Sequence, residues 1–345
     1  MHHPQPIFES SPDHPPSCHA ATLVELPDRR LLAAWFAGTH EGHPDVAIWL
    51  SHFEGGAWRE PIKIADEPGV PLWNPVLFRD TTDTVWLFYK AGPTIPAWTG
   101  TYMKSHDGGR TWSAPTALPA GLIGPAKNKP VILSNGDIVC GTSSESWRSW
   151  ACWVEVSGDG GQTWSRHGPI AAPGFPVYAR ASDDPVSATW DTASGELLLP
   201  QDHAGVIQPA VWEYAPGCLK MLMRATRRVG GVCTSLSDDY GRTWSPAVLT
   251  DIPNPNSGLD AARLADGRIV LACNPTPAGR TPLSLLVSED NGETWPWRRD
   301  VEAEPEEYSY PSVIQATDGT VHVVYTYQRK QICHLALDLD GWIAA

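Results

Sequence analysis

The stretch S-H-D-G-G-R-T-W, from Ser105 to Trp112, recurs along the chain with the pattern S-x-D-x-G-x-T-W. The pattern predicts a hairpin turn in which the Asp side chain caps the turn and Gly adopts a positive φ. We expect the Trp side chain to fill the gap to a neighbouring sheet. Four close copies of an eight-residue pattern indicate a repeat protein. The other three copies are S-G-D-G-G-Q-T-W (Ser157–Trp164), S-D-D-Y-G-R-T-W (Ser237–Trp244) and S-E-D-N-G-E-T-W (Ser288–Trp295).

Two weaker copies extend the repeat towards both ends: S-H-F-E-G-G-A-W at Ser51–Trp58 and D-L-D-G-W at Asp338–Trp342. About twenty residues before each copy lies a second turn between β-rich apolar runs, for example S-N-G-D-I-V around Asn135. The two turns alternate to give six units of roughly fifty residues. We therefore predict an all-β protein, a six-bladed β-propeller forming a single domain over residues 1–345. One interval is too long, which predicts an inter-blade insertion at about 171–204.

The bulk composition limits the partners. The chain has 345 residues, a formal net charge of −14 and seven Cys. An acidic protein lacks the basic surface that nucleic acid or an anionic membrane requires, so neither partner is expected. The Cys number is odd and the spacing is not that of a metal site, which indicates mostly buried thiols in a reducing compartment. The N-terminus has no signal-peptide pattern, so we expect a cytoplasmic protein. No cofactor is predicted.

A polar residue opens the first strand of each unit. The innermost strands of a propeller line its central channel and their starts share one face, so we expect these side chains to converge on one site. Asn74 is expected to hydrogen-bond sugar hydroxyls, Lys129 to add positive potential and Asp260 to supply a carboxylate. The six residues are His19, Asn74, Lys129, Gln208, Asp260 and Tyr310.

The repeats resemble those of the BNR/Asp-box sialidase superfamily over nearly the whole chain outside the insertion. The resemblance implies a site where three Arg bind a substrate carboxylate, a Tyr assisted by a Glu attacks, and an acidic residue is the general acid/base. Tyr310, eight residues before Asp318, resembles the nucleophile, and Tyr308 is the alternative. Arg224 and Arg280 resemble the second and third of the carboxylate-binding Arg. A guanidinium can grip a carboxylate with two parallel hydrogen bonds, which Lys cannot do.

Two positions depart from the pattern of the family. His19 stands where the first Arg is expected, and Gln208 stands where the Glu partner of the Tyr is expected. Gln cannot accept the phenolic proton as a carboxylate can, whereas His can bind an anion when protonated or act as acid or base. The loop F-A-G-T-H-E-G-H-P-D corresponds to the loop that carries the acid/base, with Glu41 and Asp45 as candidates. We prefer Glu41 because Asp45 begins the next strand, which leaves Asp45 as a binding residue. His40 and His43 in the same loop are only a weak indication of a metal site, and no metal is predicted.

Three functions fit these residues. The preferred one is a sialidase-like exo-glycoside hydrolase, with a terminal acidic sugar of an oligosaccharide or glycoside as its substrate. The second is a uronate-specific glycan lyase that uses His19 and Tyr310 as base and acid in a β-elimination. The third is a non-catalytic glycan-binding propeller.

Overall fold

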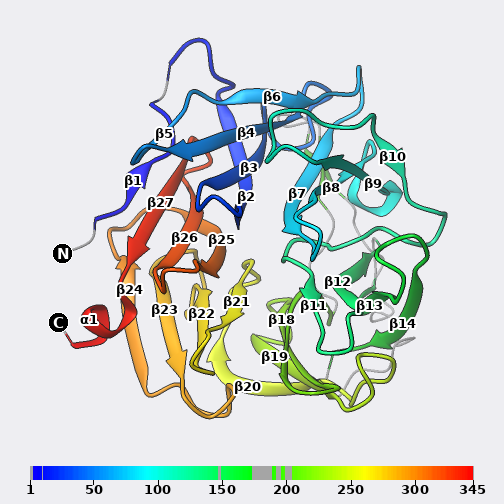
Figure 1. The fold of residues 1–345 in the computed structure, drawn as a ribbon, viewed down its shortest axis with the longest axis vertical. Coiled ribbons are helices and arrows are strands. Elements are labelled where there is room, and N and C mark those ends of the chain that lie inside the picture. The colour runs from blue at the N-terminus through cyan, green and yellow to red at the C-terminus, as the bar shows by residue number, and fades with distance from the viewer. Residues whose placement is uncertain are drawn as a thin grey trace.

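The computed structural model describes residues 3–9, 11–146, 149–172, 189–191, 196–198 and 204–344. Six antiparallel sheets surround a central axis (Figure 1). The strands of each sheet follow one another outward from that axis in chain order, except that the outermost strand of the sixth sheet comes from the N-terminus. The six-bladed β-propeller predicted from the alternating turns is therefore confirmed. Because the blades repeat around the axis and their strands are short, this fold leaves few exposed sheet edges.

Each blade is a meander that runs outward from the axis. Blade one contains β2 (Ser17–Glu25), β3 (Leu31–Gly38), β4 (Ala47–Glu54), β5 (Ala57–Trp58) and β6 (Ile62–Ala65). Blade two contains β7 (Leu72–Arg79), β8 (Val85–Ala91), β9 (Thr99–Ser105) and β10 (Thr116–Ala117), with a 3-10 turn at Ile95–Ala97. Blade three contains β11 (Val131–Ile132), β12 (Ile138–Glu145), β13 (Trp150–Ser157) and β14 (Ser165–Ile170).

The remaining blades follow the same order. Blade four contains β17 (Val206–Ala215), β18 (Cys218–Ala225), β19 (Gly231–Ser237) and β20 (Val248–Pro253). Blade five contains β21 (Asp260–Arg263), β22 (Ile269–Cys273), β23 (Leu283–Ser288) and β24 (Trp297–Glu302). Blade six contains β25 (Tyr308–Gln315), β26 (Val321–Tyr327), β27 (Gln331–Leu337) and, from the opposite end of the chain, β1 (Gln5–Pro6).

Blade six is closed by the N-terminal strand. Gln5 pairs with His334 and Pro6 with Cys333, which brings the two ends of the chain to the same blade (Figure 1). The prediction of a sixth repeat turn at Asp338–Trp342 is wrong, because this segment belongs to helix α1 (Leu339–Ala344). Since β1 supplies the outermost strand, the chain needs no further hairpin after β27.

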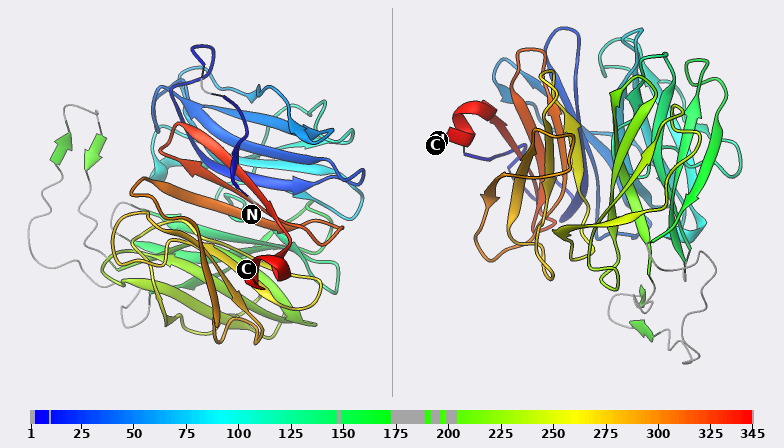
Figure 2. Two further views of the ribbon diagram at one scale, coloured as in Figure 1. Left: turned by 90° about the vertical axis from the view of Figure 1, so that its left-hand side faces the viewer. Right: turned by 90° about the horizontal axis from the view of Figure 1, so that it is seen from below.

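The predicted insertion lies between β14 and β17. Its strands β15 (Thr189–Asp191) and β16 (Glu196–Leu198) pair with each other outside the ring of blades (Figure 2). Most of the remaining span at about 171–204 lies outside the described residues.

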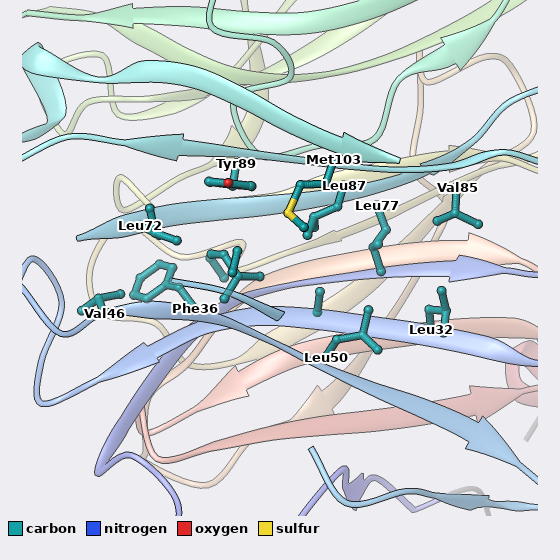
Figure 3. Close-up of a cluster of buried hydrophobic side chains, with 14 of the residues drawn as sticks. Leu32, Phe36, Val46, Leu50, Leu72, Leu77, Val85, Leu87, Tyr89 and Met103 are labelled. Carbon is teal, nitrogen blue, oxygen red and sulfur yellow. The ribbon is translucent and has the colours of Figure 1, made fainter. Parts of the chain in front are cut away.

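The core is divided among the interfaces between blades. In the cluster of Figure 3, Leu32 and Leu50 of blade one face Leu77 and Leu87 of blade two, and all four side chains are buried. Full burial of a side chain of this size contributes about 1.5–3 kcal/mol. Five similar clusters, each between two neighbouring blades, complete the ring in the described part of the chain.

The repeat turns have the predicted geometry. In the first copy, Asp107 Oδ1 accepts from Ser105 Oγ at 2.8 Å and from the Thr111 N–H at 2.9 Å, while Oδ2 accepts from Thr111 Oγ1 at 2.6 Å. The same bonds recur in the other three copies. Each repeat Trp packs into the cluster between its own blade and the preceding one. These residues are Trp112, Trp164, Trp244 and Trp295.

Asp290→Asn is expected to reduce the loss of folding stability that occurs as the pH falls from about 5 to about 2. Hydrogen bonds from the Thr294 hydroxyl and amide, and from Ser288, lower the pKa of Asp290 to about 2. A carboxylate with a depressed folded-state pKa contributes stability above its unfolded value of about 3.9 and loses that stability as the pH falls towards about 2. Thermal unfolding from about pH 5 to about pH 2 measures the difference in slope, with exposed Asp251→Asn as the control. Parallel curves for Asp290→Asn and the wild type would contradict the assignment.

All seven cysteines are unpaired, and all but Cys218 are buried, as the odd number and spacing indicated. Among the described residues, no helix has the length and apolar character needed to cross a bilayer.

Candidate functional site

Four innermost strands carry a β-bulge at which one residue adopts the left-handed backbone conformation. The pairing with the second strand shifts register at each of these bulges. Such backbone is costly for a residue with a side chain, and it occurs mainly where the surrounding structure imposes it, often at functional sites. The residues are Ala20, Asn74, Gln208 and Tyr310, with φ of 56°, 36°, 53° and 52°.

These bulges correct part of the register predicted from the sequence. Asn74, Gln208 and Tyr310 occupy equivalent positions, as expected. In blade one the left-handed position is taken by Ala20, so the predicted register at His19 is one residue early. The reason lies in the turn that follows each strand: Arg29, with φ of 65°, is equivalent to Asp83, with φ of 62°, and counting back from these two residues aligns Ala20, not His19, with Asn74.

Arg224 contacts two of the other predicted residues, Gln208 and Tyr310. Its Nη1 donates to Tyr310 Oη at 2.6 Å and to Gln208 Oε1 at 3.1 Å. Its Nε donates to Asn256 Oδ1 at 2.8 Å. Arg224, Gln208 and Tyr310 are all at least nine-tenths buried and come from β18, β17 and β25. A buried guanidinium with neutral partners holds the phenol oxygen in a strongly positive environment.

Arg280 forms part of the wall of an open pocket with a volume of about 570 Å³. Its guanidinium carbon lies 5.5 Å from the ring centroid of Tyr310, the same distance as that of Arg224. Arg329 and Glu307 also line this pocket. Glu307 Oε1 accepts from Arg280 Nη1 at 2.9 Å and lies 3.4 Å from Arg329 Nε. The pocket therefore presents guanidinium groups suited to a carboxylate ligand.

His19 lies against the phenol ring of Tyr310. The two ring centroids are 4.2 Å apart, and the His19 Nδ1 is 3.0 Å from Thr326 Oγ1. Its Nε2 is buried and has no hydrogen-bond partner in the described structure. Burial, followed by the charges of Arg329 and Arg280, lowers the pKa of His19 well below its usual value. His19 is therefore neutral at neutral pH and available as a proton acceptor rather than as an anion-binding cation.

The other predicted site residues lie outside this cluster or at its edge. Lys129 Nζ donates to Asp260 Oδ2 at 2.9 Å, and Asp260 is fully buried, so these two residues contact each other. Asn74 Nδ2 donates to the Ala126 carbonyl at 3.2 Å. Asp45 accepts from the amide and hydroxyl of Thr39. Their roles in binding a substrate stay predictions.

Glu41 reaches the site through Arg329. Its Oε2 accepts a hydrogen bond from Arg329 Nη1. The pKa of Arg329 is raised because the charges of Glu41 and Glu307 outweigh the opposing effect of burial. The structure therefore brings together His19, Gln208, Arg224, Arg280 and Tyr310, with Glu41 at the margin.

Arg329 and Glu307 are the main residues that sequence reasoning missed. Arg329 lies in the turn between β26 and β27, the same hairpin of its blade as the ones that carry Arg280 in blade five and Glu41 in blade one. A comparison of these equivalent hairpins would have drawn attention to Arg329. Glu307 directly precedes β25 and has no comparable signal.

The described residues contain no group of three His, Cys, Asp or Glu side chains placed to hold a metal ion. His40 and His43 have ring centroids 5.1 Å apart, and His43 pairs instead with Asp45 at 2.7 Å.

A six-bladed propeller with Tyr and Arg gathered at the axis has the architecture of a sialidase-fold protein. Residues 29–323 match the BNR repeat-like domain, and the chain belongs to this family.

The similar proteins support this fold. A sialidase from Bacteroides fragilis is 23% identical over 333 residues, covering 82% of this chain and 54% of that protein. A sialidase from Micromonospora viridifaciens is 23% identical over 286 residues, covering 64% of this chain and 44% of that protein. The chain thus spans about half the length of the curated relatives it matches. The solved structure of a Hadza microbial sialidase aligns with a TM-score of 0.77 at 19% identity, covering 98% of this chain and 69% of that one.

Proposed function

We propose that the protein is an exo-acting glycoside hydrolase for a terminal sugar that bears a carboxylate. The observation that supports this proposal most is the position of Tyr310 beside Arg224 and Arg280, next to a pocket that Arg329 also lines. A ligand carboxylate can replace Glu307 as the partner of Arg280 and Arg329, whereas an apolar or neutral ligand that displaced Glu307 would leave these guanidinium groups without an anionic partner. Sialidases among the similar proteins support the same class of reaction.

In the proposed mechanism, Arg280 and Arg329 bind the substrate carboxylate and fix the sugar over Tyr310. When the phenol oxygen attacks the anomeric carbon, its proton passes to the neutral His19 beside the ring as the bond to the leaving oxygen breaks, and water later hydrolyses the glycosyl–tyrosine bond. Alternatively, the phenol oxygen stabilises the positive charge that develops at the anomeric carbon. Arg224, hydrogen-bonded to the phenol oxygen, stabilises negative charge on that oxygen. Glu41 donates the proton to the leaving oxygen, which requires that its ion pair with Arg329 first opens and that its carboxylate takes up a proton from water.

The carboxylate requirement can be tested on the substrate itself. We expect kcat/KM for a sialoside or glucuronide to exceed that of the matching carboxamide by at least about 100-fold, because charged hydrogen bonds contribute about 1.5–3 kcal/mol each. Arg280→Met should remove most of this preference, while exposed Lys63→Met should preserve it. Equal turnover of acid and amide, or no turnover of any acidic glycoside, would overturn the proposal.

A uronate lyase is the second candidate, and the neutral imidazole of His19 favours it. In a β-elimination, His19 would remove the proton next to the carboxylate and Tyr310 would protonate the leaving oxygen as the carbon–oxygen bond breaks and a carbon–carbon double bond forms. Gln208 in place of a carboxylate is compatible with this role. The unsaturated product absorbs in the ultraviolet, so a rise in absorbance with uronate glycans identifies the lyase, and release of a saturated sugar excludes it.

A further inference from the structure

A short polar segment crosses towards the propeller axis in blade three. Residues 125–128, P-A-K-N, precede β11 and form what we call the axial segment. Asn128 Nδ2 donates to the Gln208 carbonyl of blade four at 2.9 Å. Lys127 Nζ donates to the Leu259 carbonyl at 3.1 Å and to the Pro311 carbonyl of blade six. One segment of blade three therefore ties together the inner strands of three other blades.

Lys127 is almost completely buried, with 4% of its surface exposed. Its third hydrogen bond goes to Asn128 Oδ1 at 2.9 Å. No carboxylate of the described residues lies within ion-pair distance of its Nζ. Burying an ammonium group with only neutral acceptors is costly. A methionine of similar length would avoid that cost but would leave the Leu259 and Pro311 carbonyls without this donor, so the lysine acts here as a hydrogen-bond donor to the backbone of two other blades.

The position of Lys127 is closely related to that of Tyr310. Its Nζ lies 6.0 Å from the ring centroid of Tyr310. The Pro311 carbonyl that it binds immediately follows the left-handed backbone of Tyr310. Gly258 leaves the space between them open: a Cβ there would lie 3.2 Å from the Tyr310 ring and 3.4 Å from Lys127 Cε. The absence of a side chain at Gly258 lets the lysine approach the ring.

We infer that Lys127 is a positioning residue for Tyr310, which fixes the strained backbone after the phenol and supplies a third positive charge beside its ring. The effect of Lys127 on turnover, as part of this inference, rests on the proposed function. A cation close to an aromatic ring is attracted to its face, and it also stabilises negative charge on the phenol oxygen. Lys127 acts on substrate only through Tyr310.

The charge of Lys127 changes close to neutral pH. Burial, partly offset by the charge of Asp260 and reinforced by those of Lys129 and Arg224, lowers the pKa of Lys127 to about 7. Asp260 lies on β21, Lys129 precedes β11 and Arg224 lies on β18, while Tyr310 faces Lys127 from β25. The charge of Lys127 also contributes to the lowered pKa of His19 on β2. The ammonium form is present below about pH 7 and loses its proton above it, so the environment of Tyr310 is expected to change across this range.

The test follows the Tyr310 13Cζ resonance in tyrosine-labelled protein, assigned by its absence in Tyr310→Phe. In the wild type we expect this resonance to shift with an inflection near pH 7. Lys127→Met should abolish the inflection. Lys220→Met is the matched control, because Lys220 is equally buried and binds the Gly292 carbonyl and Glu293 away from Tyr310. It should keep the inflection.

Kinetics provide the second measurement. Lys127→Met is expected to lower kcat about tenfold with KM within about twofold, as a change confined to the reacting group would do. A persistent inflection in Lys127→Met, or its loss in Lys220→Met as well, overturns the inference. If Lys127→Met does not fold, the wild type decides, since a Tyr310 resonance without an inflection near pH 7 also overturns it. The NMR measurement needs no substrate, so failure to find turnover would count against the proposed function alone.

Discussion

Replacing Tyr310 by Phe is expected to lower kcat on an acidic glycoside by at least about 10³-fold while KM changes less than about threefold. The substitution removes only the oxygen that accepts the hydrogen bond from Arg224 at 2.6 Å. The ring contact with His19 at 4.2 Å can be kept by Phe. Arg224 also retains Gln208 and Asn256 as partners, so the cluster should remain folded. Steady-state kinetics on the best acidic substrate measure both constants.

Tyr308→Phe is the matched control. The sequence leaves Tyr308 and Tyr310 as alternatives because they are two residues apart on one strand. In the structure Tyr308 packs in the cluster between blades five and six, with its ring stacked on Tyr327 at 5.3 Å. Its hydroxyl oxygen is therefore not expected to contribute to turnover. Comparable losses in the two variants, or activity above about a tenth of wild type in Tyr310→Phe, would remove Tyr310 from the mechanism.

Asp260→Ala is expected to reduce the free energy of unfolding by about 3–5 kcal/mol, the cost of breaking a buried ion pair from one side. Asp260 is fully buried, and its Oδ2 accepts from Lys129 Nζ and from the Val313 amide, each at 2.9 Å. It thus links blades three, five and six. Urea unfolding followed by tryptophan fluorescence measures the change.

The surface pair Lys63–Asp66 gives the comparison for this prediction. Both side chains are more than two-fifths exposed, and Asp66→Ala should cost less than about 1 kcal/mol. Adding Lys129→Met to Asp260→Ala should recover part of the stability, because the lysine no longer needs a partner. A loss below about 1 kcal/mol for Asp260→Ala would show that this ion pair does not hold the three blades together.

The sequence predicts the blades well because the information is local. Ser, Asp, Gly, Thr and Trp at fixed spacing specify one turn, and the turn geometry is repeated in all four copies. The closure of blade six by β1 depends instead on contacts between the two ends of the chain. No local pattern shows such a contact. The weak copy of the repeat at Asp338–Trp342 therefore wrongly predicted a sixth hairpin turn, where the structure has helix α1.

The candidate site was only partly predictable. Arg224 lies on a regular strand and Arg280 in a hairpin, and the register of both follows from the turns. Tyr310 lies at a bulge, but its position is equivalent to those of Asn74 and Gln208 and is therefore predictable from the repeat. His19 lies one residue before the position equivalent to Asn74, because Arg29, and not Asp28, is the turn residue equivalent to Asp83. Lys129 and Asp260 pair with each other, and their contact with a substrate stays a prediction. Arg329 belongs to the site through a long-range ion pair with Glu41, which spacing cannot show.

The ion pairs of Glu41 and Glu307 with the pocket guanidiniums have a consequence for ligand exchange. Arg280 and Arg329 are already neutralised by carboxylates of the protein itself. An acidic ligand must therefore displace the carboxylate of Glu41 or Glu307 from its arginine, because neither guanidinium group is unpaired. Because one carboxylate replaces another at the same guanidinium group, few ion pairs are gained on binding. The affinity of the pocket for an acidic ligand should therefore vary only weakly with ionic strength. Selectivity then depends on how well the incoming group fits, more than on how strongly it is attracted from solution.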